Sequence, residues 1–210
     1  MTLSKDIEEN YKHFKNDFVD CSDFLVRKAK IGDKKLFFAA CDGLIDSLQL
    51  SQMVVSPILK SEDISIDNIK KSITNCVELN EAKTFADCYY YIMSGFAIVV
   101  VDGENIALAF GIQNPPSRSV DEPTNEQSTK APKEAFVEIL NTNKALLRKR
   151  LKTPHLKLKQ IKLASAAPAP CVIAYMDDRA DKELVTQIIS AVQNSKSVSY
   201  THLRAHETCA

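Results

Sequence analysis

Hydrophobic positions along the chain follow two spacings, one typical of helices and one typical of strands. Apolar residues recurring every three or four positions predict helices, and short apolar or alternating runs predict strands. The predicted helices cover residues 3–17, 46–60, 67–76, 84–93, 132–151 and 181–193. The predicted strands cover residues 24–31, 35–41, 77–79, 97–101, 106–110, 156–163 and 171–176.

This order of elements predicts an α/β fold. Strands alternate with helices, and the pairs Gly32-Asp33 and Asp102-Gly103 also indicate hairpins, so we expect mixed sheets. We predict two small subdomains, residues 1–112 and 133–196, joined by the polar, proline-containing segment 113–132. Because the second subdomain has only two clear strands and two helices, we expect it to be incomplete.

Composition narrows the class of protein. The chain has 45% hydrophobic and 26% charged residues and no net charge, which is ordinary for a globular protein and disfavours nucleic acid as a partner. Its six cysteines form no CxxC pair, which indicates free thiols. The sequence has no glycine-rich phosphate loop, nucleophile elbow or HExxH motif. We therefore predict no enzyme activity, catalytic residue, metal site or cofactor.

A basic stretch begins within the fifth predicted helix and continues beyond it. No acidic residue lies between Glu138 and Asp177, and the basic residues there are Lys144, Arg148, Lys149, Arg150, Lys152, Lys157, Lys159 and Lys162. One interpretation is that they complement the helix dipole and form the solvated face of a strand. The other is a positive surface for anionic lipid headgroups or an acidic partner subunit.

The fifth predicted helix carries two polar residues on its apolar stripe. The positions that share one face are Phe136, Ile139, Leu140, Asn143, Leu146, Leu147, Arg150 and Leu151. A half-buried amide or guanidinium needs a partner, and no carboxylate follows Glu138 on this helix. The preceding loop supplies Glu122 and Glu126.

The loop and this helix together resemble the most characteristic stretch of the GerA-type spore germination proteins, the A subunits of nutrient germinant receptors. The resemblance depends on Arg118, Glu122-Pro123, Glu126, Pro132, Phe136-Val137-Glu138, Asn143 and Leu147-Arg148-Lys149-Arg150. Segments 41–46 and 95–103 extend it more weakly, so that it covers roughly residues 3–196. The chain departs from the family pattern at residues 130–133, which read Lys-Ala-Pro-Lys where Arg-Gly-Pro-Arg is usual.

The resemblance implies the N-terminal domain of a receptor subunit, on the cytosolic side of the inner spore membrane. It implies homo- or hetero-oligomeric assembly with other receptor subunits and a downstream membrane domain that this sequence lacks. The domain would then act in receptor assembly and signal transmission during nutrient-triggered germination. The alternative is a small-molecule binding module with its ligand between the two subdomains.

The last residues do not fit this pattern. Residues 197–210 resemble a translated adapter sequence, and we expect them to be a non-native tail. His202 and His206 lie in this segment, so their HxxxH spacing is not evidence of a metal site.

These patterns predict a latch in which the loop folds back along the helix. Arg150 or Arg148 would pair with Glu122 or Glu126, and Asn143 would bond to loop backbone. Breaking such a pair costs about 3–5 kcal/mol if it is fully buried and far less if it is exposed. Double-mutant cycles of Glu122 and Glu126 against Arg150 should show coupling in urea unfolding, whereas strict additivity in both cycles would contradict the latch.

Overall fold

The computed structural model describes residues 1–61, 64–73, 78–114, 136–163 and 170–194. The chain forms two compact units, which are described separately. The first contains Met1–Val19 and Asp23–Pro154, and the second contains Asp20–Ser22 and the described residues from His155 onward. The first unit therefore includes the helix that follows segment 113–132, which the sequence prediction had placed in the second subdomain.

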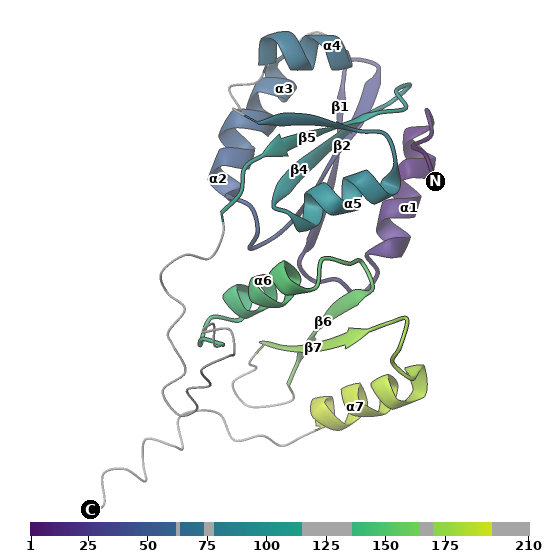
Figure 1. Ribbon diagram of the computed structural model, residues 1–210, viewed down its shortest axis with the longest axis vertical. Helices are drawn as coiled ribbons and strands as arrows, with labels where there is room; N and C mark the ends of the chain where they lie inside the picture. The colour runs from purple at the N-terminus through teal and green to yellow at the C-terminus, as the bar shows by residue number, and fades with distance from the viewer. Residues whose placement is uncertain (62–63, 74–77, 115–135, 164–169, 195–210) are drawn as a thin grey trace, which may run out of the picture. The chain divides into compact units, whose positions relative to one another are not determined.

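The first unit is built on a five-stranded antiparallel sheet in the order β1-β2-β4-β5-β3 (Figure 1). The strands are β1 (Phe24–Ile31), β2 (Lys34–Cys41), β3 (Leu79–Ala82), β4 (Phe96–Val101) and β5 (Ala107–Gly111). Every residue of β4 is buried, as expected for a central strand covered on both faces. At the sheet edge, β1 alternates between exposed and half-buried side chains.

Helices cover both faces of this sheet (Figure 1). On one face, α1 (Ile7–Asp17) and α5 (Phe85–Met93) enclose an aromatic cluster in which Phe14 contacts Phe37, Phe85 and Tyr89. On the other face, β2 residues Leu36, Phe38 and Ala40 join a core with buried residues of the following helical segments, including Val54, Ile58, Ile66 and Ile69. The two sets on β2 alternate because successive strand residues face opposite sides.

The predicted helix 46–60 is present, but its middle is wider than an α-helix. It consists of α2 (Ser47–Gln49), the π-helical turn η1 (Leu50–Val55) and α3 (Ser56–Lys60). The Ser56 N–H bonds to the Ser51 carbonyl, five residues back. Directly afterwards comes Pro57, which has no N–H and whose ring would clash with the carbonyl four residues earlier in a regular α-helix. The next helical segment, α4 (Ile66–Asn68) and η2 (Ile69–Ile73), widens in the same way.

Two helices begin later than their apolar spacing predicts. In both, an asparagine side chain forms two hydrogen bonds with the backbone of a residue that precedes the helix. In α1 the Asn10 side chain accepts a bond from Ser4 N–H (2.9 Å) and donates one to Ser4 carbonyl (2.6 Å). In α6 (Leu140–Arg150) Asn143 accepts from Val137 N–H (2.8 Å) and donates to its carbonyl (2.6 Å). Each asparagine is the fourth residue of its helix. Its side chain satisfies a backbone N–H and a carbonyl that would otherwise have formed helical hydrogen bonds.

The second unit is a small α/β element. Strands β6 (Leu156–Lys162) and β7 (Pro170–Met176) pair antiparallel, and α7 (Lys182–Asn194) follows. An isolated parallel bridge joins Cys21 to Leu158. The predicted α/β class with two units is confirmed. The five-stranded sheet, however, is antiparallel throughout rather than mixed. Two of its four strand pairs, β1-β2 and β4-β5, are hairpins, which are antiparallel by construction.

Two glycines with similar positive φ angles differ in what surrounds them, so alanine substitutions at both can separate backbone strain from the close contact with α6. Gly43 (φ +81°) lies against this helix, where an added Cβ would come within 3.2 Å of Ala145 Cβ and 3.3 Å of the Asn141 carbonyl. Gly103 (φ +85°) has nothing within 4 Å of that position. We expect Gly103→Ala to lower the free energy of unfolding by about 1–2 kcal/mol through backbone strain alone. Gly43→Ala should lower the free energy of unfolding further, because the added methyl group also meets α6. Urea unfolding measures both variants, and equal decreases would contradict the tight contact.

Candidate functional site

A buried ion pair holds the C-terminal end of α6. Arg148, in the last turn of the helix, donates from Nε to Asp23 Oδ2 (2.8 Å) and from Nη2 to Asp23 Oδ1 (2.9 Å). The two side chains are 0% and 1% exposed. This two-pronged geometry matches the planar guanidinium to the carboxylate, and lysine could not reproduce it. The pair therefore joins the end of α6 to the residue that precedes β1.

A third bond also holds the guanidinium. Arg148 Nη1 donates to the Thr153 carbonyl (2.9 Å), which fixes the chain just after the helix. The Asp23 carbonyl in turn accepts a bond from Asp42 N–H (2.7 Å), next to Gly43. Segment 41–46, which the sequence analysis singled out separately, thus meets α6. Two parts of the resemblance that lie far apart in the sequence form one structural site.

The structure locates five of the ten predicted site residues. Asn143 is half-buried and clamps Val137, and Arg148 is fully buried. Phe136, Glu138 and Arg150 are exposed. Outside the described residues lie Arg118, Glu122, Pro123, Glu126 and Pro132. The pairing of Arg150 with Glu122 or Glu126 therefore stays a prediction.

The predicted buried face of α6 is only partly correct. The stripe from Phe136 to Leu151 was expected to be buried, but Phe136 and Ile139 are 66% and 61% exposed. The buried residues of the helix are Lys144, Ala145, Leu146 and Arg148, of which only Leu146 belongs to the predicted stripe. Leu140, Asn143 and Leu147 of that stripe are half-buried. The apolar spacing misled because an arginine takes a core position that ordinarily belongs to an aliphatic side chain. Asp23, its partner, carries no sequence signal, since a single aspartate before a strand is common.

The basic stretch is used partly inside the protein. In the first unit Arg148 pairs with Asp23, and Lys144 is buried. In the second unit Lys157 is buried and lies 3.1 Å from Asp177 Oδ2, so the interpretation that put it on a solvated strand face is wrong for this residue. Lys159 lies 3.1 Å from Asp20 Oδ2. These contacts reduce the positive surface that the stretch can offer.

The thiols in the described part of the chain do not form a reactive site. Cys21, Cys41 and Cys88 are buried and reduced, and Cys171 is half-buried. Burial raises the pKa of Cys88 to about 12, so its thiolate is scarce at neutral pH. Burial and the neighbouring Asp17 carboxylate raise the pKa of Tyr89 far above its ordinary value. Cys88 and Tyr89 are therefore poor nucleophiles at neutral pH.

One group of side chains has the types that bind metal ions. His155, Asp177 and Asp178 in the second unit have donor atoms within 4.8 Å of one another. His155 Nδ1 lies 2.8 Å from Asp177 Oδ1, and Lys157 already neutralises the other oxygen of that carboxylate. Its cationic and histidine neighbours keep the pKa of Asp177 below the usual value despite burial. The group is a local ion-pair network with too few free ligands for a structural zinc site.

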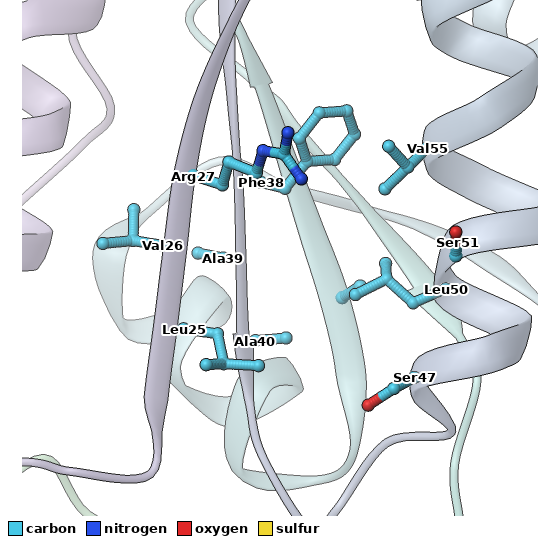
Figure 2. A pocket seen from close by; sticks show the side chains of 11 residues that line it. Leu25, Val26, Arg27, Phe38, Ala39, Ala40, Ser47, Leu50, Ser51 and Val55 are labelled. Carbon is cyan, nitrogen blue, oxygen red and sulfur yellow. The ribbon is translucent and has the colours of Figure 1, made fainter.

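The first unit also has a surface groove, shown in Figure 2. It lies between strands β1 and β2 on one side and α2 and η1 on the other, and its volume is about 310 Å³. Arg27 points from β1 toward the helical wall. No sequence pattern predicts this groove, because its residues come from four separate segments with no shared motif.

Known proteins similar to this chain define its family. The family model for the Bacillus/Clostridium GerA spore germination protein matches residues 12–202. Spore germination protein B1 of Bacillus subtilis is 29% identical over 97% of this chain and 42% of its own length. Spore germination protein KA of the same organism is 24% identical over 89% of this chain and 36% of its own length. The chain therefore spans less than half of either relative.

A solved structure agrees with the fold. The N-terminal domain of the A subunit of the Bacillus megaterium spore germinant receptor GerK3 superposes with a TM-score of 0.68 at 22% identity. The superposition covers 93% of this chain and 74% of that one. The chain described here belongs to the GerA family of spore germination proteins, which confirms the resemblance drawn from its sequence.

The buried ion pair yields a direct stability prediction. Arg148→Met or Asp23→Leu alone leaves an uncompensated buried charge, and each should lower the free energy of unfolding by about 3–5 kcal/mol. The double variant removes both charges and should recover most of that loss. Urea unfolding measures all three, with Lys149→Met on the exposed side as the control. A double variant as unstable as the sum of the single ones would contradict the pairing.

Proposed function

We propose that this chain is the N-terminal domain of a germinant receptor A subunit and acts in receptor assembly and signal transmission during nutrient-triggered spore germination. The observation that carries this proposal is the family match over residues 12–202, together with a fold like that of the GerK3 A-subunit domain. In this proposal the domain binds other receptor subunits and performs no chemical step.

The use of the α6 residues supports a mechanical role. Asn143 and Arg148 direct their hydrogen bonds to Val137, Asp23 and Thr153 of the protein itself. A catalytic or ligand-binding arginine would instead direct donors at an open site. Residues that fix α6 to the segments before β1 and after β2 make it a rigid element through which a displacement can be passed on.

The surroundings of this element offer a place for a partner subunit. Phe136 and Ile139, just before α6, are large exposed hydrophobic side chains, and Lys149 and Arg150 are exposed at its other end. Aromatic residues and arginine are enriched at protein interfaces, which fits Phe136 and Arg150. We propose that another receptor subunit covers Phe136 and Ile139 in the assembled receptor, as a homo- or hetero-oligomer.

We further propose that the domain lies on the cytosolic side of the inner spore membrane, attached through a downstream membrane domain. The described part of this chain contains no helix long and apolar enough to cross a bilayer. The relatives are more than twice as long as the segments they share with this chain, which leaves room for such a domain. Nucleic acid has no part in this proposal.

The full-length receptor subunit in spores allows the proposal to be tested. The variant Phe136→Ser with Ile139→Ser removes the exposed apolar pair without touching the core, so the domain itself should stay folded. We expect several-fold less of the other receptor subunits to co-purify from spore membranes and a slower fall of optical density after nutrient addition. Leu184→Ser on α7, which is also exposed, is the matched control and should change neither quantity.

Unchanged co-purification and germination in the double variant would contradict the proposed assembly surface. A separate arm replaces Arg148 by Met in the same subunit. Loss of the buried pair should lower the amount of the A subunit in spores, whereas Lys149→Met should not. Normal germination of spores whose A subunit lacks residues 1–196 altogether would overturn the proposed function itself.

A further inference from the structure

The groove of Figure 2 has an apolar floor and one cationic rim residue. Phe38, Ala40 and Ala97 form the floor and are almost fully buried. Leu25 of β1 and Leu50 and Val55 of η1 form apolar walls. At about 30 Å³ per water, a hollow of about 310 Å³ has room for a ligand of about ten non-hydrogen atoms.

Arg27 gives the groove its chemical selectivity. Its side chain points from β1 across the hollow toward Val55 (Figure 2), and no hydrogen bond or ion pair ties it to the described residues. The neighbouring Lys28 and Lys30 face the other side of the strand, where Lys28 pairs with Glu8. The two remaining polar side chains of the described lining are Ser47 and Ser51, and it contains no acid.

The helical wall of the groove has an unusual backbone geometry. Leu50, Ser51 and Val55 lie on the π-helical turn η1, and all three line the groove. Single π-helical turns are rare and occur frequently at functional sites, and here Pro57 just after η1 also favours this geometry. The wider turn changes the angle between the residues at its two ends, which sets how Leu50 and Val55 face the sheet.

We propose that this groove binds a small carboxylate with an apolar body, placing the carboxylate on the Arg27 guanidinium and the apolar part over Phe38 and Ala97. A planar guanidinium suits a carboxylate because it can donate two parallel hydrogen bonds. An amino acid is a poorer ligand, since its ammonium group would meet no carboxylate in the described lining. This site lies wholly in the first unit and does not depend on the proposed assembly surface.

Nuclear magnetic resonance of the ¹⁵N-labelled chain, titrated with 3-phenylpropanoate, tests the site. We expect chemical-shift changes centred on β1, β2 and η1, with weak affinity because Arg27 is exposed. Arg27→Gln should raise the dissociation constant about fivefold or more. Lys30→Gln removes the same charge from the opposite face of β1 and should leave the dissociation constant unchanged.

Two further comparisons separate this site from nonspecific binding. Ser51→Leu fills the groove and should abolish binding, whereas the neighbouring Gln52→Leu should not. The uncharged 3-phenylpropanol and the zwitterion phenylalanine should both bind more weakly than 3-phenylpropanoate. The proposal is overturned if Arg27→Gln and Lys30→Gln behave alike, if the alcohol binds as tightly, or if the shifts lie elsewhere.

Discussion

The position of α6 depends on one expensive interaction, the burial of the Arg148 guanidinium against Asp23. Removing either ion from water costs several kcal/mol, and only a close, well-aligned partner offsets that cost. Here both prongs of the guanidinium meet carboxylate oxygens at 2.8 and 2.9 Å, and the third nitrogen meets the Thr153 carbonyl. A small displacement of α6 would break this geometry at once. The helix is therefore fixed in one place by the residue that precedes β1.

The rest of the first unit is arranged around this constraint. Asp23 also anchors Asp42 N–H through its carbonyl, and the adjacent Gly43 allows α6 to approach closely. At the other end of the helix, Asn143 holds the incoming chain at Val137. Two contacts at opposite ends make α6 a rigid connection between Asp23, which precedes β1, and the exposed residues Phe136 and Ile139. Such a connection suits a receptor domain whose proposed task is to hold and pass on a conformation.

Much of the fold could be predicted from the sequence, because apolar spacing and turn residues act locally. The strand Phe24–Ile31 and its hairpin at Gly32-Asp33 are confirmed, as is the α/β class. The start of α6 was predicted too early, because an asparagine side chain replaces helical hydrogen bonds with local ones. Its buried face was wrong because Arg148 takes a core position, and its partner Asp23 comes from a distant segment. The Arg27 groove escaped detection for the same reason, since tertiary contacts alone assemble it.

Hydrogen exchange of the α6 amides is the most direct measurement of the central claim that the buried pair fixes this helix. In the wild-type chain we predict that residues 144–150 exchange nearly as slowly as the amides of β4. In Arg148→Met they should exchange far faster while β4 stays protected, because only the anchoring of the helix is lost. Equal protection of α6 in both proteins would contradict the account, since the helix would then be held by its apolar contacts alone.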